Sequence, residues 1–205
     1  MSDFIVIENV RLAFPNLKTA KSQQGDDGKP GIPKYSATFL IDPATPEGQA
    51  ALKAIKDTAI ASAKAKWPSN YAEILKMLKD QQRLCYREGP HYAKDGGVRN
   101  GWEGMVALGA SRYEDRGRPG LFDGAVQPLG DDPRGVIYSG CYVNAKVNVY
   151  AWHSPKFGKR IMAELLSVMF AGKGDAFTGG GVPDATGFEG LATETAAETS
   201  AEGLL

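Results

Sequence analysis

The chain has 205 residues, and its 24 basic side chains balance its 24 acidic ones, so the formal net charge is zero. With 42% hydrophobic and 23% charged residues, the composition is that of an ordinary soluble protein, and no stretch approaches the roughly 18 apolar residues that a membrane span needs. The two cysteines, Cys85 and Cys141, lie far apart without a CxxC spacing, which favours reduced thiols over a disulfide or a cysteine metal site.

The first elements are two strands separated by a loop. Residues 4–14 alternate with a period of two, and their apolar face comprises Phe4, Val6, Val10, Leu12 and Phe14. Residues 18–33 are rich in Gly, Pro, Gln, Asp and Lys without periodicity, so we expect a mobile loop. Residues 34–41 alternate again and predict the second strand. Because the strand pattern begins at once, no signal peptide is expected.

A helical insert follows at about residues 46–79. Thr45 is a favourable N-cap, and Pro46 suits the first helical turn. Apolar residues then recur at helical spacing until Pro68 ends the run. Asn70 resembles a second N-terminus, which predicts a short second helix.

The rest of residues 1–174 favours strands. Apolar segments at residues 105–110, 121–122 and 136–152 predict strands among many turn signals. Residues 160–170 are ambiguous between helix and strand, and the preceding Gly158 turn favours a strand. The simplest architecture is a mainly β domain, a barrel whose helices are inserted after the second strand.

Charge is unevenly distributed, because residues 175–205 contain no lysine or arginine and are rich in Gly, Ala and Thr. All 24 basic side chains therefore lie in the body, residues 1–174. The acids of the tail are Asp175, Asp184, Glu189, Glu194, Glu198 and Glu202. A basic body attracts polyanions, and an acidic segment can occupy the same surface. We therefore expect a nucleic-acid binder with a disordered, competing tail.

One strand carries the clearest candidate site. Alternate residues from Cys141 to Ala151 are all apolar and predict a barrel interior. The opposite face holds Tyr142, Asn144, Lys146, Asn148, Tyr150 and Trp152. Aromatic rings stack on any base, while Lys and Asn bind phosphates, sugars or base edges. We expect Tyr142, Lys146, Tyr150 and Trp152 to bind nucleic acid, and the alternative is a solvent face whose aromatics merely suit a strand.

The loop-rich residues 83–118 form a second candidate site. Arginine binds phosphate bidentately and also stacks on bases, and glycine-rich loops let the backbone approach a ligand. The expected phosphate ligands are Lys94, Arg99, Arg112, Arg116 and Arg118, and the expected stacking rings are Tyr92, Trp102 and Tyr113. Acids are interleaved with them, so an ordinary long loop with local ion pairs is the alternative.

No catalytic site, metal site or cofactor is predicted. The chain lacks the GxxxxGK[ST], GxGxxG and HExxH motifs. Its histidines, His91 and His153, form no evident set with a nucleophile and an orienting group. The acids at residues 123, 131 and 132 stand in turn-like surroundings, which explain them. We therefore do not expect an enzyme.

Four short segments resemble a known family. They are Trp102-Glu103-Gly104, the stretch from Arg118-Pro119 to Phe122-Asp123, the run Tyr138-Ser139-Gly140-Cys141-Tyr142-Val143-Asn144-Ala145, and Leu166-Ser167-Val168-Met169-Phe170. Over most of the body the pattern resembles the bacteriophage replication proteins that bind single-stranded DNA. Those proteins use a variant OB-fold with an acidic C-terminal tail and were long catalogued as a phage domain of unknown function.

The resemblance implies an OB-fold-like Greek-key barrel with a strand at residues 160–170. It implies non-catalytic, largely sequence-independent binding of single-stranded DNA in phage replication or recombination, in the host cytoplasm. It also implies that the tail contacts replication proteins such as a polymerase or helicase. The alternatives are a structural or protein-interaction β-domain of a phage complex and, third, an enzyme acting on nucleic acid. The sequence leaves open a homodimer and the preference between DNA and RNA.

Overall fold

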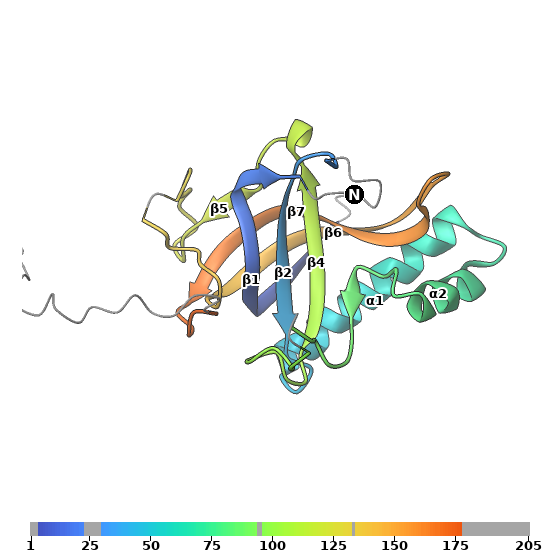
Figure 1. The fold of residues 1–205 in the computed structure, drawn as a ribbon, viewed down its shortest axis with the longest axis horizontal. Coiled ribbons are helices and arrows are strands. Elements are labelled where there is room, and N and C mark those ends of the chain that lie inside the picture. Colours follow the sequence, from blue (N-terminus) through green and yellow to red (C-terminus); the bar gives the residue numbers. More distant parts are fainter. Residues whose placement is uncertain (1–3, 23–29, 94–95, 133, 178–205) are drawn as a thin grey trace, which may run out of the picture.

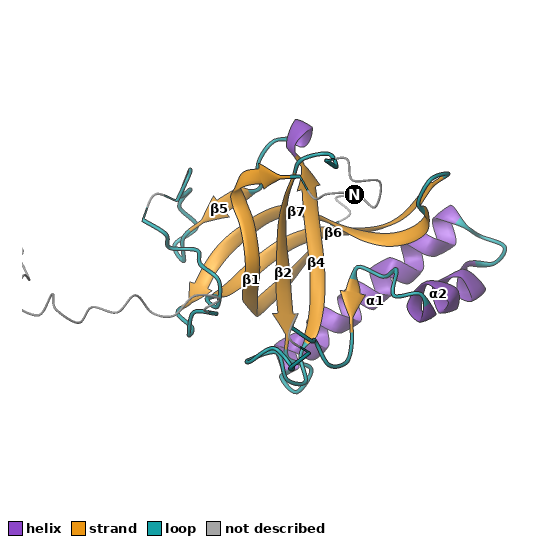
Figure 2. Ribbon diagram, viewed as in Figure 1, coloured by secondary structure: helices purple, strands orange, loops and turns teal. Residues whose placement is uncertain are grey.

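The computed structural model describes residues 4–22, 30–93, 96–132 and 134–177. Its strands are β1 (Ile5–Lys21), β2 (Lys34–Ile41), β3 (Tyr86–Arg87), β4 (Val106–Tyr113), β5 (Gly120–Phe122), β6 (Tyr142–Ser154) and β7 (Gly158–Gly172). The helices are α1 (Pro46–Lys66) and α2 (Tyr71–Asp80), and a single 3-10 turn, η1 (Glu114–Arg116), follows β4. Figure 1 shows both α-helices on one side of the strands, away from β5, and Figure 2 shows how strands dominate the body.

Five strands close into a barrel. The sheet order is β3-β4-β2-β1-β6-β7-β5, and β4 also meets β7 in parallel at Ser111 and Glu164. This contact joins the ends of the series β4-β2-β1-β6-β7, while β3 and β5 extend the edges. A closed five-stranded barrel is the OB-fold architecture. The predicted fold class, mainly β with helices inserted after the second strand, is confirmed. Its predicted disordered tail lies outside the described residues beyond Phe177.

β1 departs from its predicted pattern. The backbone is left-handed at Asn9 (φ 51°) and Phe14 (φ 48°), and the pairing register shifts at both places, as at β-bulges. Each bulge changes which side chains face the interior, although Val10 and Leu12 between them stay buried. The exposed members of the predicted apolar face are Phe4, Val6 and Phe14. The prediction of one continuous apolar face is therefore wrong for β1. The strand also continues to Lys21, into the segment that was predicted to be a loop.

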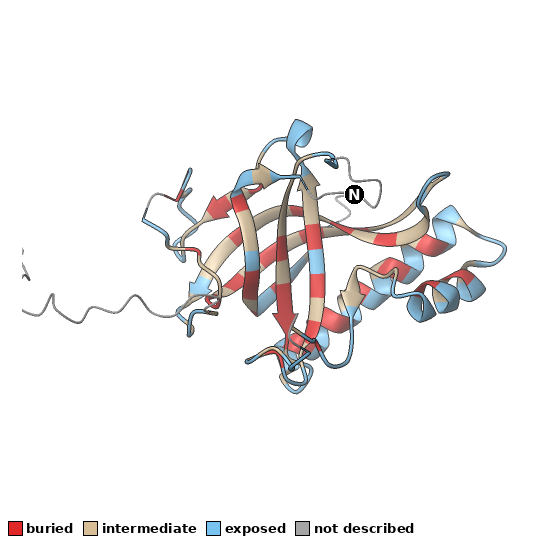
Figure 3. Cartoon of the chain, viewed as in Figure 1, coloured by how far each residue is buried: buried red, intermediate tan, exposed pale blue. Residues whose placement is uncertain are grey.

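Local signals position the helical insert as predicted. The Thr45 hydroxyl accepts a hydrogen bond from the Gly48 amide at 3.1 Å, and Pro46 opens α1. The buried face of α1 includes Ile55 and Ala59, which pack into the barrel core (Figure 3). Asn70 precedes α2, but its side chain makes no capping hydrogen bond.

The later strands differ from prediction mainly at their starts. β6 begins at Tyr142, because residues 136–141 form turns instead of extended strand. The buried carboxylate of Asp132 accepts hydrogen bonds from the amides of Val136 (2.7 Å) and Ile137 (3.1 Å), which hold that segment out of the sheet. The ambiguous residues 160–170 lie within β7, as the resemblance implied.

In the part of the chain that the structure describes, neither helix is long and apolar enough to cross a membrane. The same residues contain no cluster of three or more His, Cys, Asp or Glu side chains able to hold a metal ion.

Candidate nucleic-acid interface

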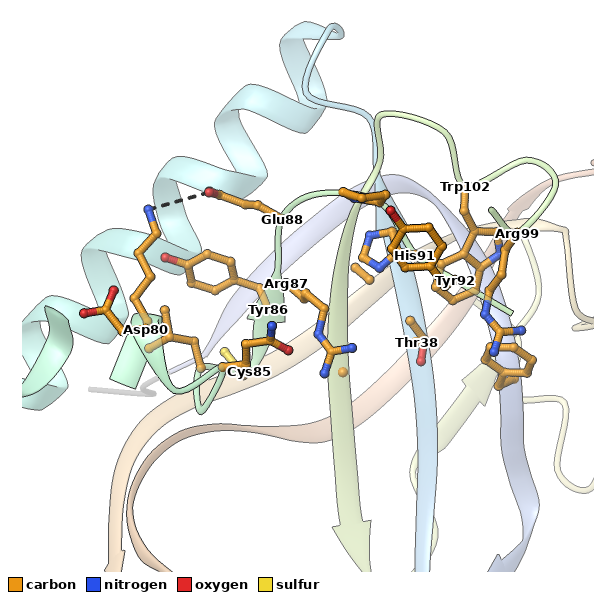
Figure 4. A pocket seen from close by; sticks show the side chains of 17 residues that line it. Thr38, Asp80, Cys85, Tyr86, Arg87, Glu88, His91, Tyr92, Arg99 and Trp102 are labelled. Atoms are coloured by element: carbon orange, nitrogen blue, oxygen red, sulfur yellow. Dashed lines mark ion pairs between the residues drawn. The ribbon is translucent and has the colours of Figure 1, made fainter. Parts of the chain in front are cut away.

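The outer face of β2 and β4 is the floor of a groove. Phe39 and Leu108 point inward and are fully buried, so the intervening residues face outward. Among these, Thr38 lies directly opposite Gly109. Two adjoining cavities of about 810 and 460 Å³ follow this face, and both are lined by Phe14, Thr38, Cys85 and Gly109. The larger one is drawn in Figure 4, where Thr38 lies between Arg87 and Arg99 in the view.

Aromatic rings gather at one end of the groove. The Trp102 ring lies 5.5 Å from that of Phe14 and 5.3 Å from that of His91, centroid to centroid. The Arg99 guanidinium lies over both Phe14 (5.0 Å) and Trp102 (5.6 Å). Trp102 is 6% exposed and supports its neighbours, whereas Phe14 and Tyr92 are 52% and 61% exposed. The rings of this cluster with exposed surface are therefore those of Phe14 and Tyr92.

Cations outnumber acids along the groove. The basic side chains lining the two cavities are Lys34, Lys79, Arg83, Arg87, Arg99 and Arg160. The acids are Asp80 and Glu88, and a hydrogen bond from Lys56 lowers the pKa of Glu88. The Nε atom of Arg160 is buried and has no hydrogen-bond partner among the described residues. The excess of basic side chains means that the groove attracts anions.

Four predicted binding residues gather at a second place, the β4–β7 contact. Arg112 and Arg116 both bind the Glu164 carboxylate, at 2.8 and 3.1 Å. Tyr113 is exposed at the end of β4, and burial raises the pKa of Tyr150, whose surroundings include Glu164, Tyr113 and Arg116. This cluster combines two guanidiniums with one carboxylate and two phenol rings.

The predicted binding residues of β6, namely Tyr142, Lys146, Tyr150 and Trp152, point away from the barrel interior, but they do not form one site. The Lys146 ammonium lies 3.7 Å from the centroid of the Phe4 ring, on the surface where β6 pairs with β1. Tyr142, half-buried, lies on the same side near the strand's start. Trp152 at the other end is paired with Arg160, which lines the groove. Of these β6 residues, those at the Trp152 end of the strand therefore lie next to the groove.

Two further predicted cations lie outside these clusters. Arg118 is ion-paired with Asp131, and Lys94 falls outside the described residues. The predicted loop residues that line the groove are therefore Tyr92, Arg99 and Trp102.

Three groove residues were absent from the sequence prediction, namely Phe14, Lys34 and Arg160. Three more lay within the predicted segment 83–118 but were not singled out as ligands, namely Arg83, Arg87 and Gly109. Phe14 was assigned to the core because its bulge was not foreseen. A usable signal existed, because OB-folds bind ligands on the face of their second and third barrel strands. Residues 34–41 and 105–110 were the second and third predicted strands, and the side chains between the inward ones lie on this floor.

The first tail residues lie against the body beside the aromatic cluster. Arg11 Nη2 donates a hydrogen bond to the carbonyl oxygen of Asp175 at 2.7 Å. Its guanidinium lies 4.2 Å from the centroid of the Phe177 ring, which is itself 6.4 Å from that of Trp102. Residues 174–177 are thereby held next to the groove. The predicted tail acids beyond the described residues are Asp184, Glu189, Glu194, Glu198 and Glu202.

A family comparison covers nearly the whole chain. The family model described as Enterobacter phage Enc34, ssDNA-binding protein, matches residues 3–200. The chain belongs to this Enc34 family. The resemblance noted from the four sequence segments is thereby confirmed.

Relatives of this Enc34 family chain match it over most of their length. Protein p50 of Acyrthosiphon pisum secondary endosymbiont phage 1 is 35% identical over 189 residues, which is 91% of this chain and 93% of that protein. The single-stranded DNA-binding protein from bacteriophage Enc34, solved in complex with ssDNA, has a TM-score of 0.67 and 28% identity, covering 86% of this chain and 90% of its own. The crystal structure of gp2.5, a single-stranded DNA-binding protein of bacteriophage T7, has a TM-score of 0.51 and 14% identity over 95% of this chain and 98% of its own, and supports the fold alone.

Proposed function

We propose that this chain binds single-stranded DNA, without catalysis and without strong sequence preference, during phage DNA replication and recombination. The groove over β2 and β4 carries the proposal, because it combines exposed aromatic rings with more basic than acidic side chains. The Enc34 protein, 28% identical, was solved with ssDNA, which supports the same class of ligand for this chain.

In the groove, bases stack on rings and phosphates meet cations. Phe14 and Tyr92 offer the exposed ring faces, and Trp102 holds Phe14 and Arg99 in place. Stacking contributes about 1–3 kcal/mol per base and tolerates any base, because every base has a π-face. Arg99 and Arg160, which line the two cavities, bind phosphates through their guanidinium groups.

A longer strand extends from the groove onto the neighbouring predicted residues. Trp152 lies beside Arg160, and Tyr113, Arg116 and Tyr150 follow at the β4–β7 contact. Here Arg116, more exposed than Arg112, contributes the free donors. Tyr142, Lys146 and Arg118 are assigned to outer contacts that only long strands reach, and Lys94 is kept as a phosphate ligand on the ground of the sequence alone.

The acidic tail competes with DNA for this surface and recruits replication proteins such as a polymerase or helicase. The anchoring of residues 174–177 beside Trp102 supports the competition, because it starts the tail next to the groove. Its acids then act as a tethered polyanion at high local concentration.

Fluorescence anisotropy with labelled oligo(dT) at several salt concentrations tests the proposal. Each phosphate neutralised contributes about −0.7 to the slope of log affinity against log salt. We expect Arg99→Ala to weaken binding and to make this slope shallower by about 0.7. The matched control is Lys53→Ala, which removes an exposed cation of α1 that is paired with Asp57, and it should leave both quantities unchanged.

Three outcomes contradict the proposal. Absent or salt-independent binding to oligo(dT) would show that the phosphate contacts on which the proposal depends are not made. Binding to a replication protein but not to DNA supports a protein-interaction domain instead. Cleavage of labelled DNA in Mg²⁺, abolished by chelation, supports an enzyme.

A further inference from the structure

An exposed glycine occupies the centre of the groove floor. Gly109 lies in the middle of β4, opposite Thr38, and lines both cavities, so it stands where they meet. Its amide donates a hydrogen bond to the carbonyl oxygen of Cys85 at 2.8 Å. The backbone at this point is therefore held from both sides within the sheet.

The fold does not require glycine at this position. A Cβ atom on Gly109 would meet only the Cys85 carbonyl oxygen, at 3.8 Å, which is ordinary van der Waals contact. Gly109 is not among the residues with a left-handed backbone, and β4 pairs with β2 over its whole length without a register shift. The usual structural reasons for a glycine within a strand, a bulge or tight packing, are thus missing here.

Two other glycines of this region differ from Gly109, because the structure explains why each is a glycine. Gly101 (φ +77°) and Gly140 (φ +105°) both have left-handed backbones. A Cβ atom would lie 2.8 Å from the Phe177 ring at Gly101 and would overlap the Asp175 carbonyl oxygen at Gly140. Both glycines are explained by the segment packed on them, whereas nothing in the described residues packs on Gly109.

Glycine also weakens a strand, because it loses more backbone freedom on folding and contributes no side chain to cross-strand pairs. β-Branched residues suit a position such as this one, opposite Thr38 on a half-exposed face. At position 109 a residue that is unfavourable for stability therefore stands where the protein itself has room for a larger one.

We propose that Gly109 is the point of closest approach between the protein and the DNA strand, where one nucleotide packs directly on the β4 backbone. The inference rests on the proposed function and identifies the part of the groove on which it depends. A glycine inside a strand often marks a bulge, a tight bend or a place where a ligand approaches the backbone closely, and the first two are missing at Gly109. Any side chain at position 109 projects between the two cavities that meet there and separates them.

The test measures stability and affinity in the same variants. Gly109→Ala and Gly109→Val are compared with the control variant Gly172→Val. Gly172 lies in β7 outside both cavities, and a Cβ atom there would meet its nearest neighbour at 3.9 Å. We expect both position-109 variants to melt at or above the wild-type temperature. We expect Gly109→Val to lose about tenfold or more in affinity for labelled oligo(dT), comparable to one stacked base, and Gly109→Ala to lose less. Gly172→Val, whose neighbour Tyr142 is reached only by long strands, should bind short oligo(dT) as wild type does.

The possible results separate this inference from the proposed function. If Gly109→Val binds DNA as tightly as wild type while Arg99→Ala binds less tightly, the nucleotide does not pack at Gly109 but the groove still binds DNA. If Gly109→Ala lowers the melting temperature by several degrees, the fold needs the glycine and the inference fails on its structural premise. If the wild-type protein does not bind DNA, the proposed function itself is refuted.

Discussion

Glu164 joins the two strands of the parallel β4–β7 contact, and its replacement tests how the barrel is closed. Its carboxylate is 13% exposed and accepts hydrogen bonds from Arg112 at 2.8 Å and from Arg116 at 3.1 Å. β4 and β7 share only one ladder pair in the described residues, Ser111 with Glu164. We therefore expect the Glu164→Gln variant to be less stable than its small change in shape suggests.

The magnitude follows from the exposure of the two partners. A hydrogen bond to a charged group contributes about 1.5–3 kcal/mol, and an exposed ion pair about 0–1 kcal/mol. The Arg112 side chain is 22% exposed and that of Arg116 is 58% exposed, so most of the loss comes from Arg112. We expect a loss of about 2 kcal/mol in the free energy of unfolding, which lowers Tm by about 4–8 °C for a domain of this size.

Thermal unfolding followed by circular dichroism measures this loss. The control is Arg116→Gln, which removes the more exposed partner and should cost less than about 1 kcal/mol. A Tm for Glu164→Gln within about 1 °C of wild type would refute the reasoning, because the carboxylate would then contribute nothing to closure. The Glu164→Gln variant also removes the ion pair of Arg116, whereas Arg112 keeps its hydrogen bonds to the carbonyl oxygens of Arg116 and Gly117. Its affinity for long oligo(dT) at low salt should therefore rise if Arg116 contacts phosphate.

Four further predictions concern the tail and the groove. Ending the chain after Phe177 removes the later tail acids and should tighten DNA binding most at low salt, and unchanged or weaker binding would show that the tail does not compete. Gly140→Ala should displace residues 174–177 and cost about 1–3 kcal/mol in urea unfolding, because its backbone is left-handed (φ +105°) and a Cβ overlaps Asp175; wild-type stability would contradict this. Burial raises the pKa of the Cys85 thiol from 9.0 to about 12. Its alkylation by iodoacetamide near pH 8 should therefore be slow in the folded protein and fast in urea, equal rates being the contrary result. Stability should also fall as the pH rises above about 9, because the unfolded chain releases this proton first.

The parts of the fold that depend on local signals were predictable from sequence. Residues 34–41 form β2 as their alternation indicates, and Thr45 caps α1. β1 was not predictable in the same way, because its bulges place Asn9 and Phe14 in the left-handed region, which no alternation pattern reveals. Residues 136–141 have the composition of a strand, but the carboxylate of Asp132, only four and five residues earlier, accepts hydrogen bonds from the amides of Val136 and Ile137 that a strand would need.

Some residues of the candidate site were likewise predictable from sequence, and others were not. Tyr92, Arg99 and Trp102 were predicted because aromatic and arginine side chains on a loop suggest nucleic-acid contacts, and all three line the groove. The pairing of Arg112 with Glu164 was not predictable, since the two residues meet only when the barrel closes. The groove floor was missed for a different reason, because residue types alone were used to choose the site, and the face of the second and third strands on which OB-folds bind ligands was not considered.

The groove floor has a consequence for how the protein folds. Its two strands, β2 and β4, are neighbours in space but are separated along the chain by residues 42–105, which include both α-helices. Closing so long a loop costs conformational entropy before the strand pairing contributes any stabilisation. Strands joined in this way therefore come together late and slowly. An oligonucleotide added at the start of refolding should therefore leave the folding rate unchanged and act only by holding the finished barrel together.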